Sequence, residues 1–150
     1  MENNISLKDF LVKAKINTYA GDGVANKLSD GSKELNYKEG IWKYKDKYFG
    51  FDPFAGQEVV FKNGKLVWMM DYYGNTFSDD ITAKEIYTFL KKAMLKVSQD
   101  KPFRGPDIFQ EGNFEYICKS EGSVDDFLGF EEIYFNNNKV YKLNYHGGKI

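Results

Sequence analysis

The chain has 150 residues, with 22 acidic residues, 21 lysines and arginines and a formal net charge of −1. This balance argues against direct nucleic-acid binding, because domains that bind the phosphate backbone usually carry a clear basic excess. A single cysteine, Cys118, excludes an internal disulfide, and with a single histidine, His146, a transition-metal site is not expected. We therefore expect one domain over residues 1–150 that holds neither a metal nor a cofactor.

The composition also bears on where the protein is located. Residues 1–10 contain no apolar signal core, and no apolar run in the chain is long enough to span a bilayer. We expect a cytoplasmic protein without a membrane partner, and the sequence is compatible with a homo-oligomer. Aromatic residues make up 17% of the chain, which is enough to fill a core and still line a pocket.

The first predicted helix begins near Ser6. Ser6 and Asp9 have the spacing of a capping box, with Asp in the place of the usual Glu. Residues that recur every three or four positions form one face of this helix, namely Leu7, Phe10, Leu11, Ala14 and Thr18. Residues 19–35 contain three glycines and no periodic pattern, so we expect a mobile surface loop that can serve as a lid.

Strands are predicted after this loop. In residues 41–48, aromatic and acidic side chains alternate with lysines, which is typical of a strand with one lysine face. Residues 57–62 and 65–73 then flank Asn63-Gly64. An Asn-Gly pair between apolar strands is a strong hairpin signal, because both turn residues need a positive φ.

The second half of the chain shows a similar order. Thr82 and Glu85 form a full capping box at the start of a predicted helix, which ends before Pro102. The segment 98–111 is expected to be a second loop. Three further strands are predicted at 113–118, 131–135 and 139–146. The last two form a hairpin with an asparagine turn, since Asn tolerates left-handed backbone.

The two halves also resemble each other residue by residue. Residues 37–74 align with 109–147 with one inserted residue near Ser123, and about a third of the aligned pairs are identical. We interpret this as an internal duplication with pseudo-repeats 1–75 and 76–150, although matched Gly and Tyr also arise by chance in strand-rich chains. The predicted fold class is α+β, a twisted antiparallel sheet with two helices on one face, built from a helix and about three strands, twice.

The two-residue turn predicts which side chains share a face of the sheet. It pairs 62 with 65, 60 with 67 and 58 with 69. The face expected beneath the helices holds Val59, Phe61, Leu66, Trp68, Met70 and Tyr72. The opposite, open face holds Glu58, Val60, Val67, Met69, Asp71 and Tyr73, and in the second half Glu131, Ile133, Val140, Lys142, Asn144 and His146. This mixture of carboxylates and apolar groups predicts a shallow groove with a few polar anchors.

The groove suggests a candidate ligand site. A carboxylate among aromatic rings attracts an organic cation, through its charge and through the negative ring faces. The candidate ligand-binding residues are Glu58, Asp71, Tyr73, Glu131, Asn144 and His146, with Trp42 and Tyr44 as aromatic faces. Each also has a purely structural alternative. Glu58 and Glu131 can pair with lysines, Trp42 and Tyr44 can belong to the core, and a lone histidine is most often a surface or core residue.

Three classes of function remain open at this point. The first is a module that binds a small molecule. The second is an enzyme in which Glu58 and Asp71, with Glu131 as their pseudo-symmetric partner, perform general acid–base hydrolysis. The third is a protein-interaction module that pairs through an exposed edge strand or apolar patch. Cys118 is expected to be a buried, unreactive thiol.

Several short motifs together are similar to a known family. They are Tyr19-Ala20-Gly21, residues 42–50 (WKYKDKYFG), residues 54–60 (FAGQEVV), Tyr72-Tyr73-Gly74, Phe103-Arg104-Gly105-Pro106 and Tyr145-His146-Gly147-Gly148. This set resembles a family of bacterial domains of unknown function. Members sometimes follow an N-terminal helix-turn-helix segment of the XRE type, which implies a sensory or effector role. We expect this chain, which has no room for that segment, to act differently.

A second likeness concerns architecture alone. Duplicated helix-and-strand domains of the gyrase-inhibitor-like type bind lipophilic cations in an aromatic groove with a central acid. The repeat and the pair Glu58 and Glu131 are similar to that arrangement, but no strand is predicted before the first helix here. A likeness of fold does not establish a function.

Overall fold

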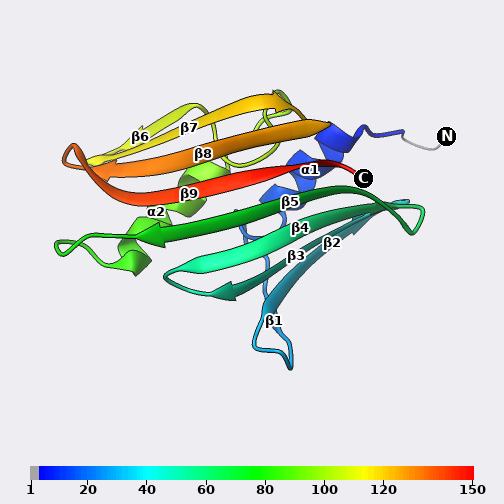
Figure 1. The fold of residues 1–150 in the computed structure, drawn as a ribbon, viewed down its shortest axis with the longest axis horizontal. Helices are drawn as coiled ribbons and strands as arrows, with labels where there is room; N and C mark the ends of the chain where they lie inside the picture. The colour runs from blue at the N-terminus through cyan, green and yellow to red at the C-terminus, as the bar shows by residue number, and fades with distance from the viewer. Residues whose placement is uncertain (1–3) are drawn as a thin grey trace.

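The structure is a computed structural model that describes residues 4–150. It is an α+β fold in which nine antiparallel strands form one open sheet with two helices (Figure 1). The elements are α1 (Leu7–Ile16), β1 (Asn26–Lys27), β2 (Lys33–Glu39), β3 (Trp42–Gly50), β4 (Phe54–Lys62), β5 (Lys65–Thr76), α2 (Ala83–Met94), β6 (Ile108–Glu111), β7 (Phe114–Ser123), β8 (Asp126–Phe135) and β9 (Asn138–Lys149). The sheet order is β1-β2-β3-β4-β5-β9-β8-β7-β6, so β5 and β9 join the two halves.

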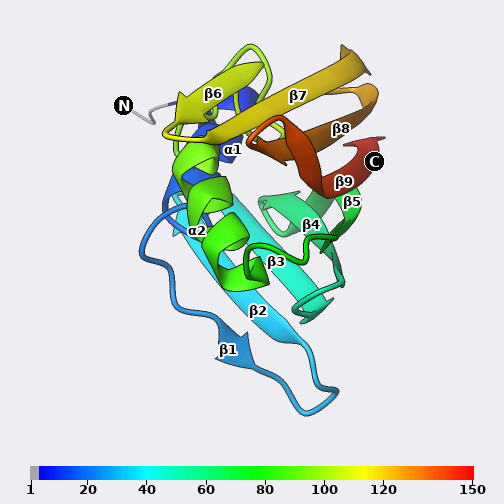
Figure 2. The ribbon, with the colours of Figure 1, turned by 90° about the vertical axis from the view of Figure 1, so that its left-hand side faces the viewer.

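Both helices lie on the same face of the sheet (Figure 2). Their predicted starts are confirmed, since Ser6 and Thr82 are the N-caps and each closes a capping box with the acid three residues later. One hydrophobic core fills the space between the helices and the sheet. Neither helix among the described residues has the length and apolarity to cross a bilayer.

The strand count exceeds the prediction of about three strands per half. The sequence predicts a loop over 19–35, yet this segment contains β1 and the start of β2, and the loop predicted at 98–111 contains β6. β1 and β6 form the two edges of the sheet, where each pairs with only one neighbour, and β2 lies next to the two-residue β1. Edge strands are short or polar, so their sequences carry little of the alternation that identifies a strand.

A β-bulge in each main hairpin overturns the predicted register. Residue 62 does pair with 65, but Val60 pairs with Trp68 and Glu58 with Met70, because the register shifts by one residue after Val60. The hairpin of β8 and β9 shifts in the same way after Ile133. The extra residue turns the preceding part of β4 and of β8 over relative to the partner strand. Val59 and Phe61 therefore lie on the open face, and Glu58 and Glu131 face the helices.

Candidate functional site

The eight candidate residues are divided between the two faces of the sheet. Glu58, Glu131, Trp42 and Tyr44 lie in the interior beneath the helices, with 0%, 0%, 6% and 0% of their surfaces exposed. Asp71, Tyr73, Asn144 and His146 lie on the open face and are exposed. The prediction of one open groove that holds all eight is therefore wrong. For Glu58 and Glu131 the cause is the pair of bulges described above. Trp42 and Tyr44 follow their structural alternative and belong to the core.

The interior of the first half contains a buried ion pair. The ammonium group of Lys15, from α1, lies 2.7 Å from Glu58 Oε1 on β4, and both side chains are fully buried. Lys15 also donates to the carbonyl of Phe103 at 2.7 Å, and the Tyr44 hydroxyl donates to Glu58 Oε1. Glu58 Oε2 is buried without a hydrogen-bond partner among the described residues. Burial lowers the pKa of Lys15, despite the neighbouring Glu58 charge.

A second carboxyl group adjoins this ion pair. Asp46 on β3 lies directly opposite Glu58 in the strand register and is 3% exposed. It accepts a hydrogen bond of 2.5 Å from the Tyr72 hydroxyl. Burial, and secondly the Glu58 charge, raise the pKa of Asp46 to about 7. Below this pH the carboxyl group of Asp46 is mainly protonated and neutral.

The interior of the second half is built around Glu131. The guanidinium of Arg104 contacts Glu131 Oε1 through Nε at 3.1 Å and Nη2 at 2.6 Å. The hydroxyls of Tyr116 and Tyr141 donate to the same carboxylate at 2.5 Å and 2.7 Å, so both carboxylate oxygens are bonded. Burial acts to lower the pKa of Arg104, but the charge and hydrogen bond of Glu131, together with Tyr19 and Tyr141, outweigh it, and the pKa lies well above its ordinary value.

The two clusters meet between the helices and the sheet. The Arg104 guanidinium lies 5.3 Å from the ring centre of Tyr19 and 5.7 Å from that of Tyr72, which bonds to Asp46. Lys15 holds the carbonyl of Phe103, the residue before Arg104. These contacts attach the segment before β6 to α1 and the sheet, so this segment is part of the interior and not a free lid. The clusters are consistent with the structural alternative for Glu58 and Glu131.

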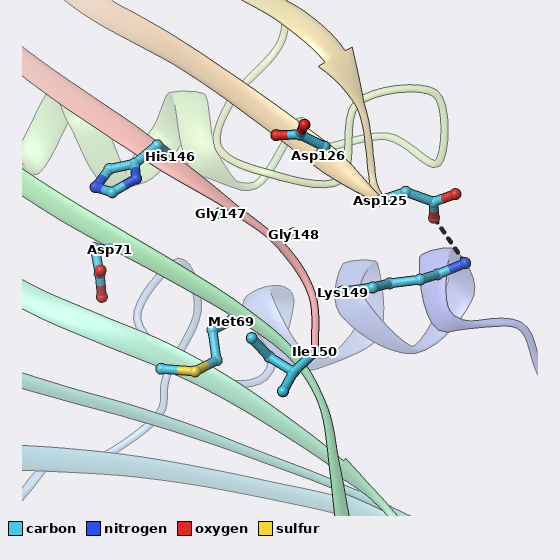
Figure 3. Close-up of a pocket in the computed structure, with 9 residues that line it drawn as sticks. All are labelled: Met69, Asp71, Asp125, Asp126, His146, Gly147, Gly148, Lys149 and Ile150. Carbon is cyan, nitrogen blue, oxygen red and sulfur yellow. Dashed lines mark ion pairs between the residues drawn. The ribbon is translucent and has the colours of Figure 1, made fainter.

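The open face contains a shallow pocket where β5, β9 and the start of β8 meet. Its volume is about 490 Å³, and it is lined by Met69, Asp71, Asp125, Asp126, His146, Gly147, Gly148, Lys149 and Ile150 (Figure 3). Asp71 and His146 are direct cross-strand partners and lie side by side at one end. We call this set the acidic pocket. It contains two of the eight candidate residues.

The polar groups of the acidic pocket are only partly paired with one another. Asp71 Oδ1 accepts a bond of 2.8 Å from the Gln57 amide, and Asp125 forms an ion pair of 2.6 Å with Lys149. Within residues 4–150, neither Asp71 nor Asp126 forms an ion pair. Tyr73 and Asn144 pair with each other two residues along the strands from Asp71 and His146, and neither lines the pocket.

Two glycines allow the strands to come together at this pocket. A Cβ on Gly147 would lie 2.1 Å from the Met69 carbonyl oxygen, and a Cβ on Gly148 would lie 2.4 Å from that of Asp125. Both contacts are with backbone and cannot relax. The backbone of β9 therefore approaches β5 and the 123–126 turn closely, and the hollow is shaped by main chain as much as by side chains.

The structure separates the carboxylates that acid–base catalysis would need. Glu58 lies in the interior, whereas Asp71 lies on the opposite face of the sheet, so they cannot act on one substrate. In residues 4–150, no three His, Cys, Asp or Glu side chains are grouped so as to hold a metal ion. Cys118 is buried as expected, and burial raises the pKa of its thiol.

Sequence reasoning missed several residues that matter at these sites, namely Lys15, Asp46, Arg104, Asp125 and Asp126. Two of them carried a signal. Lys15 follows Leu7 and Leu11 at intervals of four, on the buried side of α1, and Asp46 alternates with Trp42 and Tyr44. A charged residue at a core position predicts a buried partner. Arg104 lies in a loop and had no such signal.

The fold and these sites define a domain with an open antiparallel sheet, a buried layer of charges and an acidic pocket on its uncovered face. The family model described as "Domain of unknown function (DUF5680)" matches residues 46–150, and the chain belongs to this family. The match begins in β3 and so includes both main hairpins and Arg104. No curated protein and no solved structure matches the chain.

Proposed function

We propose that this protein binds a small organic cation in the acidic pocket on the open face of the sheet. The observation that carries the proposal is the composition of the pocket, in which Asp71, Asp125 and Asp126 surround a volume of about 490 Å³ and Lys149 is the only lysine or arginine. Lys149 already pairs with Asp125. The other two carboxyl groups lack a cationic partner within the described part of the chain, and a bound cation supplies one.

The apolar lining adds to this charge. Met69 and Ile150 lie next to each other on the same side of the pocket (Figure 3). The side chain of Ile150 is 70% exposed, so an apolar ligand group that covers it gains hydrophobic stabilisation. A thioether and an aliphatic group beside carboxylates favour a lipophilic cation over a small hydrated ion.

The test is calorimetric titration with tetraphenylphosphonium, a lipophilic cation, and with triphenylphosphine oxide, a neutral molecule with similar aromatic groups. We expect only the cation to bind. Asp71→Asn combined with Asp126→Asn should weaken binding by up to about thirtyfold, because each exposed charge contributes up to about 1 kcal/mol and the two together up to about 2 kcal/mol. The matched control is Glu121→Gln, which removes a carboxylate from β7 outside the pocket and should leave the affinity unchanged.

Two results would reject the proposal. One is binding of the neutral molecule with the same affinity as the cation. The other is an equal loss of affinity in Glu121→Gln and in the double variant, which would indicate unspecific attraction to the charge of the whole protein.

We also infer that the two halves descend from one duplicated unit. Several features of the first half recur in the second at an offset of 72 or 73 residues. Tyr44 bonds to Glu58 as Tyr116 bonds to Glu131. The bulge after Val60 recurs after Ile133, and the left-handed turn residue Asn63 recurs as Asn136. The central register agrees, because Tyr72 pairs with Tyr145, its counterpart at an offset of 73. Exchange of equivalent turn residues, described below, tests the structural equivalence on which this inference rests.

A further inference from the structure

A second pocket on the open face has the opposite charge. It lies at the outer end of β2, β3 and β4, where β2 turns into β3 and β4 turns into β5. Its volume is about 530 Å³, and its lining consists of Lys38, Gly40, Ile41, Lys43, Lys45, Phe61, Asn63 and Gly64. We call this set the basic pocket. It contains three lysines and no carboxylate.

The lysines of the basic pocket are not neutralised by the protein. Lys38 and Lys43 are direct cross-strand partners, and like charges in that position destabilise a sheet. Within residues 4–150, none of the three lysines forms an ion pair, whereas the neighbouring Lys47 pairs with Asp30 at 2.7 Å. The chain as a whole has a net charge of −1, so this cluster does not reflect a general excess of lysine.

The second half of the molecule shows that the fold does not require these lysines. In the first half, Lys43 pairs with Lys38 on one side and with Phe61 on the other. In the second half, Glu115 takes the place of Lys43, and it pairs with Gln110 and with Tyr134. The hollow at that place is lined by Gln110, Gly112, Asn113, Phe114, Glu115, Tyr134, Asn136 and Asn137 and measures about 250 Å³. There the Gln110 amide donates to the Glu115 carboxylate. The same strand arrangement thus holds a hydrogen-bonded pair in the second half. In the first half it holds lysines without an ion-pair partner and a pocket of about twice the volume.

From this contrast we propose that the basic pocket binds a small phosphorylated molecule with two or more negative charges and an aromatic or apolar part. Lysine ammonium groups bind phosphate oxygens as point charges, and three of them suit a di- or triphosphate. Phe61 and Ile41 supply the apolar surface. Ile41 is 39% exposed, and the half-buried ring of Phe61 can stack on a nucleotide base. The cation site proposed above is separate and has the opposite charge.

The experiment is a titration of the full chain with inorganic triphosphate and with adenosine triphosphate, at low and at physiological ionic strength. We expect both to bind, the nucleotide more tightly, with weaker binding at higher salt. Lys43→Gln combined with Lys45→Gln should reduce the affinity for triphosphate at least tenfold. Phe61→Leu should reduce binding of the nucleotide and leave that of triphosphate unchanged.

Matched control variants distinguish binding at the basic pocket from unspecific attraction of triphosphate to lysines elsewhere on the sheet. Lys119→Gln and Lys142→Gln remove lysines from the same face of β7 and β9, outside the basic pocket, and should leave the affinity unchanged. The melting temperature of the Lys43 and Lys45 double variant should equal or exceed that of the parent, because it relieves repulsion between neighbouring lysines. An equal affinity for triphosphate in the parent, the double variant and the controls would overturn the proposal. Binding to vesicles of anionic phospholipid without binding to triphosphate would overturn it as well.

Discussion

Each half of the sheet buries one carboxylate beneath the helices, but the groups that neutralise and hydrogen-bond the two carboxylates differ. Glu131 receives four hydrogen bonds, two from Arg104 and two from tyrosines, and both of its oxygens are satisfied. Glu58 receives two, from Lys15 and Tyr44, and one of its oxygens has no partner in the described structure. Buried ion pairs are stable only when the remaining polar atoms are also bonded. The carboxylate of the second half is therefore fully hydrogen-bonded, whereas the carboxylate of the first half keeps one oxygen without a partner.

The difference between arginine and lysine makes this contrast testable. A buried lysine can release its proton when it loses its partner, whereas an arginine remains charged. Lys15 already has a lowered pKa because of burial, while the pKa of Arg104 is raised by Glu131 against the effect of burial. Loss of the carboxylate should therefore be tolerated better in the first half.

The largest predicted effect follows from this. Glu131→Gln should lower the free energy of unfolding by about 3 to 5 kcal/mol, because it leaves the Arg104 charge buried and unpaired. Glu58→Gln should cost less, about 1 to 3 kcal/mol, since Lys15 can become neutral and the repulsion with Asp46 is removed. Urea denaturation of both variants at neutral pH measures the difference. Equal losses, or a larger loss for Glu58→Gln, would show that the two clusters do not differ in the way described.

A second prediction concerns pH and separates the halves again, because the position that corresponds to Asp46 is occupied by Cys118. The pKa of Asp46 is raised from 3.8 to about 7, so the folded state holds this proton more tightly than the unfolded state. The protonated Asp46 carboxyl therefore contributes to the stability of the folded state. This contribution is complete below about pH 4 and is lost as the pH rises to about 7. Relative to Asp46→Asn, the parent should lose about 1 to 4 kcal/mol of stability over this range, because a tenfold difference in proton affinity corresponds to about 1.4 kcal/mol.

Chemical denaturation of the parent and of Asp46→Asn at several pH values between 4 and 8 provides the measurement. The difference between the two proteins is the relevant quantity, because it cancels the contributions of titrating groups that do not interact with Asp46. A difference that stays constant over this range would mean that Asp46 is ionised in the folded state throughout.

A smaller effect is expected at the basic pocket. Lys38→Gln combined with Lys43→Glu copies the Gln110 and Glu115 pair of the second half. It replaces a repulsive cross-strand pair with one that can form a hydrogen bond, so it should stabilise the domain by about 0.2 to 1 kcal/mol. The gain should appear in thermal unfolding without ligand, and binding of triphosphate should be lost at the same time. Destabilisation would mean that the lysines contribute to the fold after all.

The smallest effect concerns the two equivalent turns. Gly64 has a φ of 76° and Asn137, at the corresponding position, has a φ of 65°. Asn137→Gly should be neutral or stabilising by less than about 1 kcal/mol, because glycine adopts this backbone without a steric cost. Gly64→Asn should change the stability by a similar amount in the opposite direction. Thermal unfolding of both variants tests the equivalence of the turns, and two large losses would argue against it.

Local features were readable from the sequence because each depends on a few neighbouring residues. The capping boxes at Ser6 and Thr82 identified both helix starts, and Asn63-Gly64 identified the central turn of the first half. The alternation in residues 41–48 correctly separated the lysine face of β3 from its buried face. The resemblance of the halves also anticipated a helix followed by strands, twice.

Only the tertiary structure decided which face of the sheet each carboxylate occupies. A single extra residue in β5 and in β9 reverses the alternation, and a bulge leaves no mark in the apolar pattern, so the pattern alone places Glu58 and Glu131 on the wrong face. The partners of these acids are distant in sequence, 43 residues away for Lys15 and 27 for Arg104. Short-range physics thus determined the elements of this protein, whereas the long-range pairing of strands and charges determined which of its polar residues are buried and which face solvent.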